Sequence, residues 1–580
     1  MNGCMEVQVM NSYPYENEAT KIWGEYKKTK EYQDSMNFRT DFPEIVRFKE
    51  GDQWPAPTKK TKNFPRPVFN ITEMFIRNKR AAVTNQNLEI SFSPLEVDEA
   101  TRETAEAGAK AYTNFSKILW ENVDQDELNN EFVDDAITVG TSILHYFWDD
   151  SVNGGHQLKF IGDLAGEVID VLNIGVAKPR EKNIQKQPYV ILESRLTIKE
   201  VQEMAKKEGI TGIEYDLIKP DNYDASYDSD RKVKDDEEVT VLTKYYKKDG
   251  VVYYSKCTQS VMIIKDRELT PVVEEMFDEL TGEPIERPKI TLYPIVVLTY
   301  KRRKKSFYGI GEAQDIIPIN KLINQSYGME ALGVIRVGNP NILAKKGALK
   351  QPLTNEPGQV IEDNYEGGGD GIKFMQPPNF SNEFSKLSGE IFELARTLTG
   401  NTDVSTGEVM GANMPASAII ALQNQAKVPI KEFQSRFFGA MKEVGDIWCQ
   451  FYKTFYSTAR NISVENNGKA ETQIFRGTDY AGTDFKTKVE VTVSSDKESL
   501  SMSVLENMKA AGDIDKYQYV ELAPDSAIPF KAKIKEMWDN EKNDLLIQAM
   551  ELIKQYQQTL GINQGGMPNE MQKMSNGNVN

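Results

Sequence analysis

The sequence has few of the side chains on which redox enzymes and metal sites most often depend. Its 580 residues include only three cysteines and two histidines, and Cys4, Cys257 and Cys449 stand far apart. Such spacing excludes a disulfide framework and does not match a zinc site. The sequence also lacks an HExxH motif, a GxxxxGK[ST] motif and a Ser/His/Asp arrangement. We therefore expect a protein that is not an enzyme and that holds no metal and no cofactor.

Long apolar runs are missing as well. Stretches such as Ile295 to Leu298 are far shorter than the roughly 18 to 20 residues that a membrane-spanning helix requires. The N-terminal segment has no basic region followed by an apolar core, so no secretory signal is predicted. We expect synthesis and residence in a cytoplasm, with no membrane association.

Basic side chains are in the minority. Lys and Arg number 70 against 87 Asp and Glu, which gives a net charge of -17. This is the wrong sign for a protein that binds nucleic acid over a broad surface by releasing counterions. Any contact with DNA must be local or weak, and many copies in a ring would form an acidic lumen that repels phosphate. An acidic surface that only keeps the protein soluble is the alternative.

The composition and the patterns along the chain favour a multi-unit α+β protein. Charged residues make up 27% and hydrophobic residues 39%, which is ordinary for a folded chain. Helical spacing recurs over 99–123 and 128–139, and Thr197 with Glu200 forms the pattern of a capping box. Strands are predicted around an Asp249-Gly250 hairpin turn.

Three polar segments are predicted to lie at the surface. The segment from Pro55 to Pro67 contains four prolines and predicts an ordered, non-helical surface. The acidic run 221–239 lacks the glycine and glutamate spacing of an EF-hand, so a solvated loop is predicted there. The basic run Lys301 to Lys305 beside a strand is read as a solvated edge in preference to a DNA contact.

The most informative stretch runs from Ser306 to Tyr456. Two helical patterns enclose a Gly/Pro-rich insert, 339–371, whose GGGDG run lacks the lysine and Ser/Thr of a phosphate-binding loop. The first helix is expected from about Pro318, where a helix tolerates proline in its first turn, to Arg336. The sequence therefore predicts two paired helices with a small projecting module between them.

The second helix of this pair carries a heptad-like stripe. Its apolar positions alternate at spacings of three and four and are Phe384, Leu387, Ile391, Leu394 and Leu398. We expect this stripe to pack against another element, and Gly400 to end the helix. Charged positions fall largely off the stripe, on surfaces that face neighbours or a channel: Lys386, Glu390, Glu393 and Arg396.

A polar loop and a long helix follow. Residues 401–415 are rich in Gly, Asn, Thr and Ser, so an exposed loop is predicted. The apolar periodicity from Ile419 to Tyr452 contains Pro429, which predicts a kink because proline removes one backbone hydrogen bond. Two separate helices that meet at Val428 are the alternative.

In this order of segments the chain resembles the portal proteins of tailed bacteriophages. The residues that carry the resemblance are GDQWPAP, RPVFNITEMF, QPYVILESRLTIKEV, YPIVVLTYKRRKKSFYGIGEAQDIIPINKLIN, NEPGQVIE and TLTGNTDVSTGEVMGANMPASAIIALQ. The resemblance implies the following division: an N-terminal wing part (1–310), a first stem helix (311–336), a clip (337–380), a second stem helix (381–400), a tunnel loop (401–415), a kinked wing helix (416–460), wing strands (461–500), a crown (501–565) and a disordered tail (566–580).

The resemblance also implies a function and partners. Portal proteins form a ring of about twelve subunits at one capsid vertex of the virion, through which double-stranded DNA is packaged, retained and ejected. Terminase large subunit docks at the clip, and a head–tail adaptor replaces it later, alongside major capsid and scaffold proteins. Clip residues expected to meet DNA or a partner are Lys345, Lys346 and Lys350. Tunnel-loop residues expected to face DNA are Asn401, Thr402, Asp403, Ser405, Thr406, Glu408 and Asn413.

Two other functions remain open on the sequence. The first is another virion ring or scaffold protein of the adaptor kind, against which the length of the chain argues because adaptors are generally smaller. The second is a metal-dependent nuclease built from dispersed carboxylates, although the sequence shows no cluster at characteristic spacing.

Overall fold

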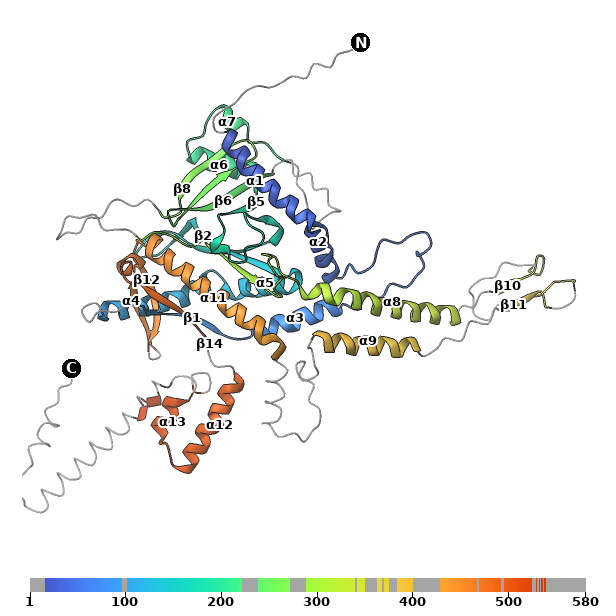
Figure 1. Ribbon diagram of the computed structural model, residues 1–580. Coiled ribbons are helices and arrows are strands. Elements are labelled where there is room, and N and C mark those ends of the chain that lie inside the picture. The colour runs from blue at the N-terminus through green and yellow to red at the C-terminus, as the bar shows by residue number, and fades with distance from the viewer. Residues whose placement is uncertain are drawn as a thin grey trace, which may run out of the picture. The chain divides into compact units, whose positions relative to one another are not determined.

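The structure is a computed structural model, and it describes most of the chain as helices, strands and ordered connections. The described residues are 16–95, 102–221, 238–271, 288–338, 342–349, 362–367, 370–374, 383–399, 428–466, 469–491 and 495–523, with single positions up to 538. They fall into two compact units, residues 1–460 with 475–490 and residues 461–474 with 491–580. Both units contain helices and the chain mixes helix with sheet, as the α+β prediction required (Figure 1).

The first unit holds most of the helices. They are α1 (Glu16–Ser35), α2 (Phe38–Lys49), α3 (Ile71–Thr84), α4 (Arg102–Asn122), α5 (Gln125–Val139), α6 (Ile198–Lys207), α7 (Ile213–Asp216), α8 (Glu312–Gly338), α9 (Glu383–Thr399) and α11 (Val428–Phe455). Short 3-10 turns are η1 (Val171–Asn173), η2 (Ile184–Lys186) and η3 (Gly477–Tyr480). Among the described residues, no helix is both long enough and apolar enough to cross a membrane.

Two antiparallel sheets form the centre of this unit. In the smaller one, β2 (Thr141–Gly154) lies between β3 (Phe160–Ile169) and β9 (Ile295–Thr299). The larger one has the order β4 (Ile174–Val176), β5 (Tyr189–Thr197), β6 (Glu238–Lys248), β7 (Val251–Cys257) and β8 (Met262–Glu268). Separately, β1 (Leu88–Pro94) pairs with β14 (Phe485–Val491), and β10 (Ile342–Ala344) with β11 (Ile372–Phe374).

Local sequence signals account for several boundaries. The hairpin between β6 and β7 turns at Asp249 and Gly250, whose φ angles of 52° and 83° match the left-handed conformation that such turns need. Thr197 caps α6, with its Oγ1 accepting from the Glu200 backbone N–H at 3.3 Å while the Glu200 carboxylate accepts from the Thr197 N–H at 2.9 Å. Both predictions are confirmed. Strand β2 continues through a bulge to Gly154.

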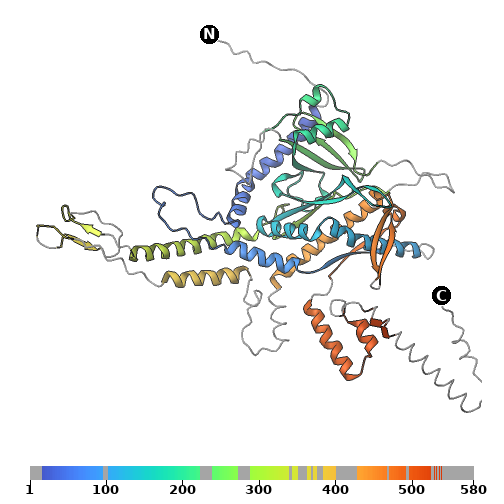
Figure 2. The ribbon, with the colours of Figure 1, turned by 180° about the vertical axis from the view of Figure 1, so that it is seen from behind.

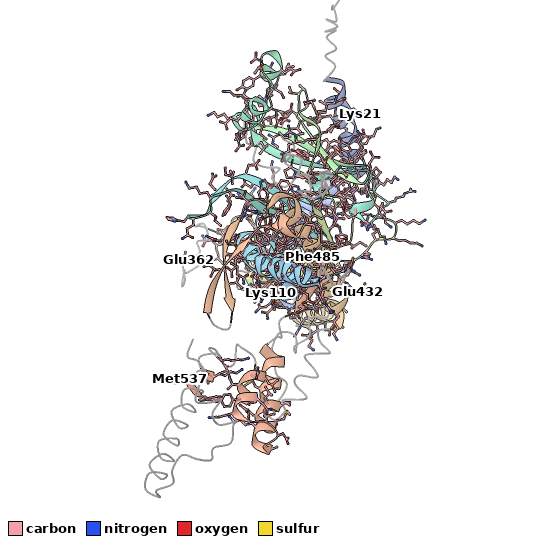
Figure 3. The ribbon with its side chains drawn as sticks, turned by 90° about the vertical axis from the view of Figure 1, so that its left-hand side faces the viewer. Lys21, Lys110, Glu362, Glu432, Phe485 and Met537 are labelled. Atoms are coloured by element: carbon pink, nitrogen blue, oxygen red, sulfur yellow. The ribbon has the colours of Figure 1, made fainter. Side chains whose placement is uncertain are left out.

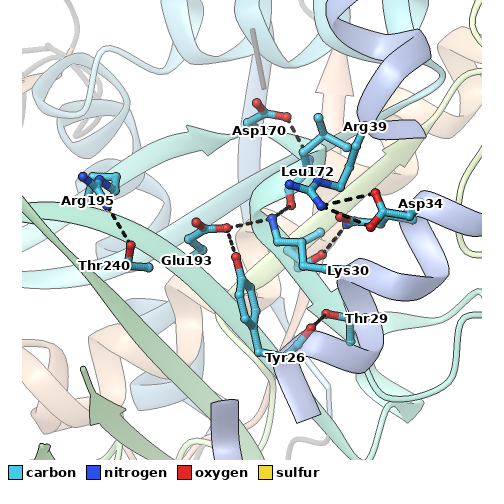
Figure 4. A network of polar contacts seen from close by, with 12 residues as sticks. Tyr26, Thr29, Lys30, Asp34, Arg39, Asp170, Leu172, Glu193, Arg195 and Thr240 are labelled. Atoms are coloured by element: carbon cyan, nitrogen blue, oxygen red, sulfur yellow. Dashed lines mark hydrogen bonds and ion pairs between the residues drawn. The ribbon is translucent and has the colours of Figure 1, made fainter. Parts of the chain in front are cut away.

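Helix α1 is held on the larger sheet by polar contacts. Figure 4 shows Tyr26 and Lys30 of α1 converging on Glu193 of β5, with Lys30 Nζ 2.8 Å from a Glu193 oxygen. The same ammonium donates to the Leu172 carbonyl at 2.7 Å. Burial and the neighbouring Glu193 raise the pKa of the Tyr26 hydroxyl, so it stays protonated and serves as a donor.

The C-terminal half of α11 lies in an aromatic core. Phe115 of α4 stacks on Phe475 with ring centroids 4.0 Å apart, and Tyr112 meets Tyr452 edge-on at 5.2 Å. Phe485 of β14 lies over α4, 4.8 Å from the Tyr112 ring (Figure 3). Such ring pairs stabilise beyond their buried area, so this end of α11 is fixed within the unit.

The second unit is smaller. It contains β12 (Arg460–Asn466), which pairs with β13 (Lys469–Phe475), and the helices α12 (Ser495–Ala511) and α13 (Lys516–Leu522). Asp515 caps α13 by accepting from the Gln518 N–H at 2.8 Å. Most of the crown implied by the resemblance, 501–565, lies outside the described residues beyond Ala523.

Candidate assembly surfaces on the paired helices α8 and α9

Helices α8 and α9 lie side by side, as Figures 1 and 2 both show. They share one apolar cluster with α3, whose buried members are Ile71, Phe75, Ile316, Ile323, Ile391 and Ala395. The Phe75 and Phe392 rings stack at 6.4 Å within it. The pairing predicted from the sequence is therefore made, and α3 completes it as a third helix.

The start of α8 is set by buried charges. Glu312, the first residue of α8, accepts from Lys79 Nζ of α3 at 2.9 Å, and its other oxygen lies 3.2 Å from Lys301 Nζ. Burial would raise the pKa of Glu312, but Lys79, the Tyr300 hydroxyl and Lys301 outweigh it, so the pKa is lowered. Burial lowers the pKa of Lys79 despite this partner. The prediction that the helix begins near Pro318 is wrong: six residues precede it, and this ionic contact fixes the earlier start.

Two asparagines extend this anchoring along α8. Asn320 Oδ1 accepts from both the backbone N–H and the hydroxyl of Thr72 at 3.0 Å, and its Nδ2 donates to the Phe69 carbonyl at 2.8 Å. Asn324 Oδ1 accepts from the Phe69 N–H at 2.9 Å, and its Nδ2 donates to Gln53 Oε1 at 2.6 Å. These amides are buried, and each contact satisfies a group that burial would otherwise penalise.

The far half of α8 differs. Its apolar side chains are exposed to solvent within one chain, with Val334 67%, Ile335 50% and Val337 52% exposed. A run of exposed branched side chains on one helix end is a candidate contact surface.

The heptad stripe predicted on α9 is only partly correct. Ile391 is buried, but Leu387 and Leu394 are 43% and 54% exposed. The buried face is centred on Ile391 and Ala395, one turn apart, so Leu387 and Leu394 fall to one side of the contact with α3 and α8. No side-chain position is described for Phe384 and Leu398.

The charged positions predicted on α9 occupy its outer surface. Lys386, Glu390 and Glu393 are exposed. Arg396 is half-buried, with Nη1 3.4 Å from a Glu393 oxygen and its guanidinium 5.9 Å from the Phe392 ring centroid. These contacts of Arg396 lie along α9 itself, and Glu393 is its ion-pair partner. Lys386 and Glu390 are exposed.

Strands β10 and β11 form a small module that follows α8 in the chain. Asp363 organises it by accepting from the Gly371 N–H at 2.7 Å and the Tyr365 N–H at 3.1 Å. Lys345 and Lys346 are exposed on its turn, and Lys345 Nζ lies 4.3 Å from the Tyr365 ring centroid. The third predicted residue, Lys350, lies outside the described residues.

Other predicted positions have mixed outcomes. The predicted DNA-facing residues Asn401, Thr402, Asp403, Ser405, Thr406, Glu408 and Asn413 lie outside the described residues, as does most of the acidic run 221–239. Pro429 stands in the first described turn of α11; the upstream helix it was expected to kink lies outside the described residues, so the kink stays a prediction. Lys301 of the basic run is paired with Asp315 at 2.7 Å, as its edge interpretation suggested. In the described residues, no group of three or more His, Cys, Asp or Glu is placed to hold a metal ion.

Sequence reasoning missed the anchors of α8. Lys79 and Glu312 are 233 positions apart, so no spacing rule connects them. Asn320 and Asn324 did leave a signal, because two asparagines one turn apart in an otherwise apolar helix face are expected to be hydrogen-bonded.

Comparison with known proteins identifies the family. The family described as phage P22-like portal protein matches residues 181–575. A solved structure titled "Virion of native gene transfer agent (GTA) particle" contains a similar chain, with a TM-score of 0.34 and 12% identity over 83% of this chain and 99% of that one. A search among curated proteins gave no match. Since the family match spans more than half of the sequence, the chain belongs to the phage P22-like portal protein family.

Proposed function

We propose that this chain is a structural protein without catalytic activity that assembles into a ring of about twelve copies at one capsid vertex. Double-stranded DNA passes through the axis of the ring during packaging and ejection and is retained there between them. Terminase large subunit docks on the ring during packaging, and a head–tail adaptor docks afterwards. Major capsid and scaffold proteins surround the ring in the virion. Family membership supports the portal role.

The ring is supported by the contrast between the two halves of α8. The half that holds Glu312, Asn320 and Asn324, here called the base, is fixed by buried contacts, and the far half is exposed. Val334, Ile335 and Val337 on α8, with Leu387 and Leu394 on α9, are exposed in a single chain. Full burial of one such side chain is worth roughly 1.5–3 kcal/mol. A second copy of the same helix pair would cover this apolar surface, as a closed ring requires of every subunit.

Electron microscopy of the purified full chain tests the ring, with analytical ultracentrifugation as a second readout. The wild type is expected to form rings, and the double variant Val334→Asp/Leu394→Asp to remain monomeric with unchanged far-ultraviolet circular dichroism. Gln325→Asp/Thr397→Asp is the matched control, since it adds two carboxylates to exposed polar positions of the same helices. A wild type that stays monomeric in the presence of scaffold and capsid proteins contradicts the proposal.

Docking of terminase and adaptor is assigned to the β10–β11 module. Its exposed Lys345 and Lys346 offer two cations to an acidic partner surface. Asp363 holds Gly371, whose carbonyl accepts from the Lys345 N–H at 2.8 Å. Lys345→Glu/Lys346→Glu is expected to leave rings intact and to weaken terminase binding, measured by pull-down with purified terminase. Equal binding by variant and wild type removes this module from the docking surface.

The DNA-facing role of residues 401–413 stays a prediction. Deletion of these residues is expected to spare ring assembly and to impair DNA packaging or retention. Unchanged packaging by the deletion variant removes this loop from the mechanism.

A further inference from the structure

The loop that connects α2 to α3 concentrates positive charge in an acidic protein. Between Asp52 and Glu73 the chain has no carboxylate, yet it carries Lys59, Lys60, Lys62 and Arg66, against a net charge of -17 for the whole chain. We propose that this loop, residues 55–67, contacts the phosphate backbone of duplex DNA through its three lysines.

The loop is a built structure held by its own hydrogen bonds. The Thr58 N–H donates to Thr61 Oγ1 at 3.0 Å, and the Thr61 N–H donates back to the Thr58 carbonyl at 3.1 Å. Arg66 crosses the loop, with Nη1 2.8 Å from the Pro55 carbonyl and Nη2 3.3 Å from Thr61 Oγ1. The four prolines further restrict its backbone, so little conformational entropy is lost when a ligand binds.

The aromatic side chains at the two ends of the loop pack against the protein. Trp54 Nε1 donates to the Pro67 carbonyl at 2.8 Å, and the Trp54 and Phe64 rings lie 6.0 Å apart. Phe64 and Pro65 press on α8 at Gly328, where an added Cβ would lie 2.9 Å from the Phe64 ring. This anchoring leaves the segment from Ala56 to Asn63 exposed along the side of α8.

The lysines on that exposed segment have no ionic partner. Lys59, Lys60 and Lys62 are exposed, and in the described part of the chain none of them lies in an ion pair with a carboxylate. Arg66 is engaged within the loop, so it shapes the site while the three ammonium groups stay available. Elsewhere in the first unit, several lysines are paired, as Lys30 with Glu193 and Lys301 with Asp315.

The chemistry of the segment favours phosphate over an acidic protein surface. Lysine is depleted in the cores of protein interfaces, which take aromatic and apolar anchors instead. The exposed apolar side chains of the loop itself are small, namely Pro55, Ala56 and Pro57, and the larger exposed Val68 and Phe69 follow it. Compact ammonium groups bind phosphates as point charges without reading base sequence. The inference rests on the proposed function only in its choice of duplex DNA as the polyanion.

The test measures binding of a fluorescent duplex of mixed sequence to the full chain over a range of salt concentrations. Lys59→Ala/Lys60→Ala/Lys62→Ala is expected to bind about tenfold or more weakly at low salt, and to lower the slope of log affinity against log salt by up to about 0.9 per lost phosphate contact. The matched control removes Lys21, Lys27 and Lys28, three exposed lysines of α1 (Lys21 is labelled in Figure 3), and should change neither quantity. Lys→Arg at the three loop positions should preserve binding, because it keeps the charge.

Two results overturn the inference. One is equal loss of affinity in the loop and α1 triple variants, which would mean that net charge alone governs binding. The other is normal DNA binding by the loop variant together with loss of an acidic protein partner, which would make the loop a protein contact. Ring formation is scored separately by electron microscopy. If the wild type forms no rings, the proposed function is contradicted. If the wild type forms rings and the loop variant binds DNA as tightly as the wild type does, the DNA contact of the loop is contradicted.

Discussion

The two halves of α8 show opposite surroundings on one continuous helix. The first half is enclosed by α3, with Glu312, Asn320 and Asn324 all buried and all hydrogen-bonded to distant parts of the chain. The second half exposes Val334 and Ile335. The difference teaches that contacts within the chain fix the first half of α8, whereas the second half leaves apolar side chains exposed in a single chain.

The two halves of α8 also differ in the kind of contact that their side chains can make. At the base, the partners are ions and amides, whose geometry fixes the position and direction of the helix. At the far end, the exposed side chains are branched and apolar, and such surfaces associate without directional bonds.

Removal of the buried Glu312 carboxylate should lower the stability of the first half of α8 more than any other change. Glu312→Ala leaves the ammonium of Lys79 buried without its partner, and we expect the free energy of unfolding to fall by about 3–5 kcal/mol. Denaturant titration of the first unit, followed by tryptophan fluorescence, measures the change. Glu330→Ala in the far half is the control and should stay within about 0.5 kcal/mol of wild type. Equal losses in the two variants would falsify the division between the halves.

Loss of one buried amide should have the next largest effect. Asn324→Leu leaves the Phe69 N–H without an acceptor, which is expected to cost roughly 1–3 kcal/mol. The neighbouring exposed position supplies the control, since Gln325→Leu removes an amide of equal chemistry that faces solvent. Hydrogen exchange at the Phe69 amide reports the contact directly, and an unaltered exchange rate in Asn324→Leu contradicts it.

The ion pair at the start of α8 also predicts that the stability of the protein depends on pH. The pKa of Glu312 is lowered in the folded protein, so its contribution to stability is complete above the ordinary value of 4.5 and is lost as the pH falls through the lowered value. Thermal midpoints of wild type and Glu312→Gln should therefore differ most above about pH 5 and converge in acid. A difference that stays constant from neutral pH into acid shows that the carboxylate charge contributes nothing.

The smallest effect is expected at the far end in separated subunits. Val334→Asp should change the free energy of unfolding of a single chain by no more than about 0.5 kcal/mol, because the side chain is 67% exposed. Ile323→Asp places the same carboxylate at a position of the same helix that is 1% exposed, and should unfold the helix base. Circular dichroism at a dilution that keeps subunits apart distinguishes the two variants. Similar losses of helical signal in both would show that the two halves of α8 do not differ.

The sequence allowed much of the secondary structure to be predicted, and fewer of the contacts. The hairpin at Asp249-Gly250 and the cap at Thr197 were predictable because each depends on neighbouring residues. The paired helices were predictable from periodicity, but the buried face of α9 was not, since Leu387 and Ile391 are equally apolar. Periodicity gives the width of an apolar stripe, and only the neighbouring helices decide which part of it is covered.

By itself, the sequence determined the α+β composition, the order of the segments and the acidic net charge, since these depend on local propensity and on counting. It also determined that the loop 55–67 would be proline-rich and basic. Only the tertiary structure decided that Glu312 meets Lys79, and that the lysines of this loop stand exposed while Arg66 is used within it. The physical reason is that a buried ion pair or a covered face joins residues hundreds of positions apart, and no local rule carries that information.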